Sequence, residues 1–211
     1  MANNAIDPRR SALLFFDMLN GHIKKNDPAT QERYRPVVAA ASRLLQAART
    51  QSMMVAYAGA NHRPDNATTA HTIRDVDFGN RTLDPKLPPT FTPLVAGGTW
   101  HAQVIDELAP EVDDYLIPKY RWSAFYQTYL DLALRTRKID TVILAGGSTE
   151  IGVASTAYSA RDMDYNLVIV SDACTSPSRE THDHLMRHVF PRMGWVRTAS
   201  EVAALLEVGR Q

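Results

Sequence analysis

The chain has 211 residues and a mass of 23.5 kDa, which is enough for one domain with a sizeable core. Hydrophobic residues make up 45% of it and charged residues 22%, so a disordered chain and a fibrous repeat are excluded. The 23 basic residues equal the 23 acidic residues, which removes the basic excess that sequence-independent nucleic-acid binding needs. We therefore expect a single domain over residues 1–211 and no nucleic-acid partner.

Cysteine content and apolar runs bear on the cellular location. The only cysteine is Cys174, so no disulfide can form within the chain, and a reducing, cytoplasmic location is the simplest expectation. Residues 1–10 lack the apolar stretch of a secretory signal. No apolar run approaches the roughly 20 residues that a membrane-spanning helix needs, so we expect no membrane partner.

Short apolar runs alternate with amphipathic stretches, which is typical of strand–helix–strand units. In chain order, the expected elements are a strand at 11–17, a helix at 36–51 with Pro36 in its first turn, a strand at 53–58, a long functional loop at 59–99, a helix at 100–108, a strand at 114–118, a helix at 124–138, a strand at 140–145, a helix at 151–163, a strand at 166–171, a helix at 179–192, a short strand at 194–197 and a helix at 200–208 capped by Ser200. This order predicts a three-layer, doubly wound α/β fold with a central, mostly parallel six-stranded sheet.

Polar residues follow four of the expected strands, at Asp17, 61–63, Lys119 and 146–150. Ligands bind at the carboxyl ends of the strands in such sheets, so we expect these residues to converge. A carboxylate and an amine that meet in a partly dry cleft hold each other ionised and can serve as a general acid/base pair. A structural ion pair is an equally good interpretation of Asp17 and Lys119.

The segment LAGGSTEIGV, at residues 144–153, runs from a strand through two glycines into a helix. Backbone N–H groups at a helix start can hold an anion or a developing oxyanion. A tight structural turn explains the glycines equally well. The spacing matches neither GxxxxGK[ST] nor GxGxxG, so no nucleotide site is indicated and we expect no cofactor.

Three segments resemble, in order and spacing, the signature segments of the isochorismatase-like hydrolase superfamily, which includes nicotinamidases and other cysteine hydrolases. They are LLFFDMLNGH at 13–22, IPKYRWSAF at 117–125 and LAGGSTEIGVASTAYSARDMDYNLVIVSDACTS at 144–176. The resemblance implies a doubly wound α/β fold, in agreement with the element order, and a homodimer or homotetramer.

The resemblance further implies that Asp17 is the acidic catalytic residue and Lys119 the catalytic lysine. In the amidase branch a cysteine nucleophile lies in a T-x-x-C-V motif, but here residues 149–153 read TEIGV and Gly152 stands at that position. Glycine cannot attack a carbonyl, so thioester chemistry does not transfer to this chain. True isochorismatases also carry glycine there; their aspartate protonates a vinyl ether, and water attacks the resulting oxocarbenium ion.

Other positions depart from the family pattern. His22 stands where the family usually has a phenylalanine that packs on the substrate ring, which predicts a more polar pocket. His62 lacks the aspartate that precedes the histidine of the family's metal motif, so we expect no metal site. We read Cys174 as a packed, inert thiol and His182, His184 and His188 as a solvated helix face. The expected substrate-binding residues are His22, His62, Trp122, Gly147, Ser148 and Ile151.

These observations predict a hydrolase that acts on a small-molecule metabolite by Asp17 general acid/base catalysis, without a covalent cysteine intermediate. The bond cleaved would belong to a vinyl ether or a related C–O or C–N group. Two alternatives stay open: a non-catalytic ligand-binding homologue, and a cysteine-hydrolase amidase whose nucleophile has been replaced by Gly152.

Overall fold

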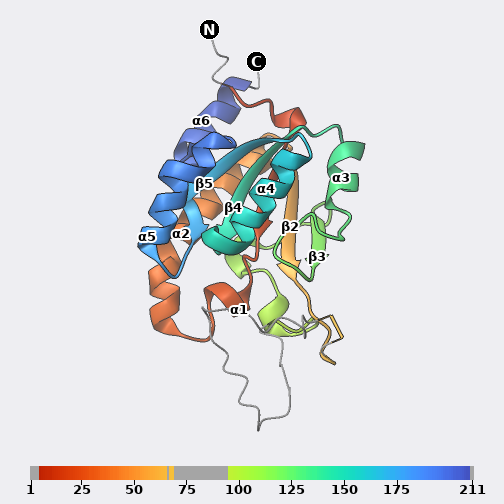
Figure 1. Ribbon diagram of the computed structural model, residues 1–211, viewed down its shortest axis with the longest axis vertical. Helices are drawn as coiled ribbons and strands as arrows, with labels where there is room; N and C mark the ends of the chain where they lie inside the picture. Colours follow the sequence, from red (N-terminus) through yellow and green to blue (C-terminus); the bar gives the residue numbers. More distant parts are fainter. Residues whose placement is uncertain (1–4, 66, 69–94, 210–211) are drawn as a thin grey trace.

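The computed structural model describes residues 5–65, 67–68 and 95–209 (Figure 1). Its centre is a six-stranded sheet in the order β3-β2-β1-β4-β5-β6, in which every neighbouring pair is parallel. The strands are β1 (Ser11–Phe16), β2 (Met54–Ala60), β3 (Tyr115–Lys119), β4 (Thr141–Gly147), β5 (Asn166–Thr175) and β6 (Trp195–Arg197). The predicted doubly wound α/β fold is confirmed. The strand order reverses between β1 and β4, and ligands bind at such a switch point in folds of this type.

Helices cover both faces of the sheet. They are α1 (Asn20–Ile23), α2 (Pro28–Thr50), α3 (Leu130–Thr136), α4 (Ala154–Asp162), α5 (Arg179–His184) and α6 (Ala199–Gly209), with the short helical turns η1 (Pro8–Arg10), η2 (Trp100–Ala102), η3 (Asp106–Leu108), η4 (Thr149–Val153), η5 (Leu185–Val189) and η6 (Phe190–Arg192). None of the helices in the described ranges combines the length and the apolar character needed to span a bilayer.

Alternation along β1 separates two hydrophobic cores. Leu14 and Phe16 point into the core formed with α3, α4 and η5, whereas Leu13 and Phe15 point into the core formed with α2 and α6. In Figure 1, α4 lies in front of the sheet, α2 lies behind it, and α1 lies below the carboxyl ends of the strands.

Helix α2 begins eight residues earlier than predicted, at Pro28 rather than Pro36. The Asp27 side chain caps it by accepting hydrogen bonds from the N–H groups of Ala29 and Thr30, at 3.3 and 3.0 Å. Pro36 therefore lies inside the helix, not in its first turn. The apolar periodicity missed the first two turns because their residues are mostly polar and exposed.

The predicted helix at 124–138 is helical only over Leu130–Thr136. Side-chain hydrogen bonds order the residues before it: the Ala124 N–H donates to Thr156 Oγ1 at 3.0 Å, and Ser123 Oγ donates to Ser159 Oγ at 2.8 Å. Hydroxyl groups of this kind compete with helical bonding and hold the segment against α4 instead.

Two further boundaries differ from the prediction. The helix expected at 100–108 is split into η2 and η3 because Val104 pairs with Leu19, the residue before α1. Helix α6 is capped by Thr198 instead of Ser200, since the Thr198 N–H donates to the Glu201 carboxylate at 2.7 Å and the Glu201 N–H donates to Thr198 Oγ1 at 3.3 Å. Most of the loop predicted at 59–99 lies outside the described residues.

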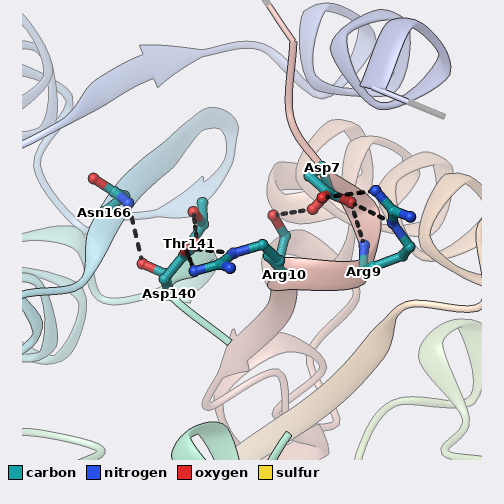
Figure 2. A network of polar contacts seen from close by, with 7 residues as sticks. Asp7, Arg9, Arg10, Asp140, Thr141 and Asn166 are labelled. Carbon is teal, nitrogen blue, oxygen red and sulfur yellow. Dashed lines mark hydrogen bonds and ion pairs between the residues drawn. The ribbon is translucent and has the colours of Figure 1, made fainter. Parts of the chain in front are cut away.

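A polar network joins the amino ends of β1, β4 and β5 (Figure 2). Arg10 Nε donates to Asp140 Oδ2 at 2.7 Å, and Ser11 Oγ donates to the carbonyl of Asp7 at 2.8 Å. The Asp140 carbonyl in turn accepts the Asn166 N–H at 2.8 Å. This network lies at the amino-terminal edge of the sheet. The candidate catalytic residues lie at the opposite, carboxyl-terminal edge, so we assign the network a structural role.

Candidate active site

Asp17 and Lys119 meet at the carboxyl edge of the sheet. Lys119 Nζ donates to Asp17 Oδ2 at 2.8 Å, and the Ala60 N–H donates to Asp17 Oδ1 at 2.8 Å. Asp17 directly follows β1, while Ala60 and Lys119 are paired residues at the ends of β2 and β3. The two charged residues are only 8% and 4% exposed. Both carboxylate oxygens accept hydrogen bonds, which suits an ionised carboxylate held beside an ammonium group.

His22 is a third titratable group at the same carboxylate. Its Nε2 lies 3.9 Å from Asp17 Oδ2, too far for a hydrogen bond. Nε2 is buried and has no hydrogen-bond partner within the described part of the chain. Burial lowers the pKa of His22, the nearby Asp17 charge opposes that effect, and the charges of Lys119 and Lys25 add to it. The imidazole is therefore neutral around pH 7.

The ring of Phe16 fills the space beside Gly152. A Cβ atom at position 152 would lie 2.5 Å from Cζ and 2.8 Å from Cδ1 of that ring, and closer still to Cε1, whereas carbon atoms in contact lie about 3.5–4.0 Å apart. Phe16 is only 1% exposed, so the ring has little room to retreat. On the same ring, Lys119 Nζ lies 4.2 Å from the centroid, within cation–π distance.

The turn that carries Gly152 is built from β4 and η4. Gly146 has φ 128°, and a Cβ there would lie 2.7 Å from the backbone nitrogen of Phe16, so only glycine lets the two strands approach this closely. The N–H groups of Ile151 and Val153 both donate to the Ser148 carbonyl, at 3.3 and 3.1 Å. These two N–H groups, which the sequence suggested as donors to an anion, therefore already have an acceptor within the turn.

Sequence reasoning missed His182 as a neighbour of this turn. Its Nδ1 lies 2.9 Å from Thr149 Oγ1, which also donates to the Thr175 carbonyl at 2.9 Å. The expectation of a solvated face was wrong for His182, which is half-buried, whereas His184 and His188 are exposed. Burial is the main cause that lowers the pKa of His182. The sequence spacing could have indicated this difference, because only His184 and His188 share a helix face and His182 lies on another.

Strand β5 runs to Thr175, beyond the predicted end at residue 171, so Cys174 lies within the strand, buried opposite Gly146 of β4. Burial raises the pKa of its thiol to about 12. The thiol is therefore neutral and poorly nucleophilic. The prediction that Cys174 is a packed thiol is confirmed.

The remaining candidate residues lie farther from the carboxylate or nearer to the surface. His62 is half-buried, with Nδ1 3.4 Å from Thr68 Oγ1, and burial and the Lys119 charge lower its pKa. Trp122 and Ile151 are 65% and 42% exposed, whereas Gly147 is buried and Ser148 partly buried. In the described ranges, no group of three or more His, Cys, Asp or Glu side chains could hold a metal ion.

A cavity of about 610 Å³ lies on the α2 side of β2 and β3, and neither Asp17 nor Lys119 is among its lining residues. Phe15, Tyr57 and Leu116 belong to its lining. Ala60 is common to both places, because it lines the cavity and its N–H group donates to Asp17.

A parallel sheet with a buried carboxylate–ammonium pair at its carboxyl edge defines a doubly wound α/β protein. The family model of the Isochorismatase domain matches residues 11–201. The chain belongs to the isochorismatase family, whose members include hydrolases.

Similar proteins agree with this assignment. Over 126 residues the chain is 48% identical to the uncharacterized isochorismatase family protein YecD of Escherichia coli O157:H7; the match covers 60% of this chain and 66% of YecD, just under two thirds. An isochorismatase family protein from Burkholderia thailandensis is 31% identical, with a TM-score of 0.79 over 96% of this chain and 98% of that one. A cysteine hydrolase from Pseudomonas syringae is 26% identical, with a TM-score of 0.79 over 97% and 95% of the two chains.

Proposed function

We propose that the protein hydrolyses a small metabolite by Asp17 general acid/base catalysis, supported by Lys119, without a covalent cysteine intermediate. The substrate class is a vinyl ether or a compound with a related C–O or C–N bond. One observation carries the proposal: the Phe16 ring fills the position of a side chain at residue 152, while Asp17 and Lys119 form a close buried pair.

The chemistry follows from the pair. The Lys119 ammonium can bind an anionic group of the substrate, and an anion that competes for Lys119 favours the protonated form of Asp17. The carboxyl then gives its proton to the vinyl carbon, and water attacks the resulting oxocarbenium carbon and loses a proton. Collapse of the hemiketal releases the alcohol and a ketone. In the proposal, His22, His62, Trp122, Gly147, Ser148 and Ile151 bind the substrate around this centre.

The test is a hydrolysis screen with 1-carboxyvinyl ethers and small primary amides. We expect the wild-type protein to hydrolyse at least one compound, and Asp17→Asn to lower kcat by about 10²–10⁴-fold, the usual worth of a general acid or base. Far-UV circular dichroism of the variant checks that the fold is retained. Unchanged turnover in a folded Asp17→Asn protein contradicts the proposal.

Gly152 favours one second candidate, a ligand-binding homologue that has lost catalysis. Binding of a panel compound without turnover, measured by calorimetry, supports that candidate. The Phe16 packing argues against the other alternative, an amidase with a replaced nucleophile, because restoring a side chain at position 152 requires the ring to move.

A further inference from the structure

The proposed hydrolysis moves two protons. One reaches the substrate, and Asp17 supplies it; the other leaves the attacking water and needs an acceptor. Lys119 is a poor acceptor, since it is an ammonium group bound to Asp17 Oδ2 at 2.8 Å. The buried thiol of Cys174 is neutral and lies within β5. Asp17 becomes a carboxylate once it has given its proton away and can accept one itself, but a second acceptor beside it would let the two transfers use different groups.

His22 has the geometry of that acceptor. Its Nε2 is the buried nitrogen without a hydrogen-bond partner among the described residues, and it lies 3.9 Å from the same Oδ2 atom that binds Lys119. The residue belongs to α1, which follows Asp17 almost directly, so the sequence fixes the two side chains near each other. The ring is partly exposed, but Nε2 itself is buried, so the proposed role requires a small movement of the ring or its neighbours to admit water.

Charges around His22 come from three directions. Asp17 at the end of β1 is the attractive charge, whereas Lys119 at the end of β3 and Lys25 after α1 are repulsive. His101 of η2 also packs on α1, with its Cβ and carbonyl facing Gly21. Burial is the main effect on the pKa of His22 and, together with the two lysine charges, it favours the neutral imidazole against the Asp17 charge. The neutral imidazole is the form that accepts a proton.

We propose that His22 is the general base of the reaction and works with Asp17 as the acid, an inference that rests on the proposed function. His22 Nε2 takes a proton from water as the new C–O bond forms, and the Asp17 carboxyl gives its proton to the substrate. The imidazolium then returns the proton from Nε2 to Asp17 Oδ2 after a closure of about 1 Å to hydrogen-bond distance. Both residues regain their starting forms, and no net proton is consumed.

The first experiment needs no turnover. Histidine ring-¹⁵N NMR follows the titration of His22, assigned by the signal lost in His22→Gln. We expect the Asp17→Asn change to lower the pKa of His22, because it removes the opposite charge that lies 3.9 Å from Nε2. An unchanged titration overturns the pairing of His22 with Asp17.

The second experiment uses the panel compound that the wild-type protein hydrolyses. We expect His22→Gln to lower kcat about 100-fold or more and to remove the acid limb of the kcat/KM profile, which a merely structural role would leave in place. The exposed His184→Gln is the matched control and should retain both. Turnover with an intact acid limb in His22→Gln overturns the base but leaves the proposed function standing. If the His22 titration responds to Asp17→Asn but the wild-type protein hydrolyses no compound of the panel, the proposed function is refuted instead.

Discussion

Changing Gly152 to alanine adds one methyl group where the Phe16 ring lies, so its effect on stability can be worked from the structure. The added carbon would lie 2.5 Å from Cζ, about 1 Å inside normal contact distance. Overpacking of a well-packed core costs about 1–3 kcal/mol. Without the ring, the same change inside a helical turn would stabilise the protein by about 0.5–1 kcal/mol. A loss of stability in Gly152→Ala therefore indicates a clash with the Phe16 ring, whereas a gain indicates that the ring leaves room.

Differential scanning calorimetry measures the effect. For a chain of this size we expect Gly152→Ala to lower Tm by roughly 3–10 °C. Gly59→Ala is the matched control, since its nearest neighbour would be the flexible end of Leu19 at 3.3 Å, and its effect should be much smaller. A Gly152→Ala protein that is as stable as the wild type refutes the packing argument.

A double-mutant cycle separates the ring from other causes. Phe16→Ala alone should cost about 3–5 kcal/mol, as removal of a buried phenylalanine does. In that background, the Gly152→Ala change should become neutral or stabilising, which gives a coupling energy of about 1–3 kcal/mol. Additive effects would show that the two residues do not compete for the same space.

Two further predictions concern the thiol and pH. Because burial raises the pKa of Cys174 to about 12, iodoacetamide should leave the folded protein unlabelled and modify it only after unfolding, as mass spectrometry can check; rapid labelling of the folded chain contradicts this. Burial lowers the pKa values of His22, His62 and His182 from 6.5, so the unfolded chain takes up more protons and stability declines as the pH falls below that value. We expect Tm to fall from about pH 7.5 to about pH 5.5, and His182→Gln to reduce the fall; an unchanged slope in that variant contradicts the assignment to His182.

Local patterns predicted the sheet and the meeting of Asp17 with Lys119. Buried parallel strands are nearly continuous apolar runs, so their ends are readable, and the carboxyl ends of neighbouring strands must share one edge. Polar stretches were harder to interpret. The first turns of α2 depend on the Asp27 cap, and Ser123 and Ala124 are held by hydroxyl contacts with α4. Neither feature produces the regular spacing of apolar residues from which helices are predicted.

Tertiary contacts explain what the sequence could not show. The spacing of the three histidines near residue 185 separated His182 from the other two but gave no partner for it; the Thr149 contact exists only because α5 packs beside η4. Likewise, Gly152 was recognisable as a missing nucleophile, whereas the ring that occupies its side-chain position belongs to a strand far away in the sequence.

The two residues that distinguish this site lie on either side of Asp17 in the sequence. Phe16 precedes the carboxylate, fills the space beside Gly152 and contacts the Lys119 ammonium. His22 follows it and places Nε2, which has no hydrogen-bond partner among the residues that the structure describes, 3.9 Å from the Oδ2 atom. A single segment, from the end of β1 into α1, thus fills the space of a side chain at position 152 and places the His22 imidazole near Asp17. Loss of the thiol by itself would leave a cavity, and a cavity would cost stability. The Phe16 ring instead fills that space, so a side chain at position 152 could be accommodated only if the ring moved.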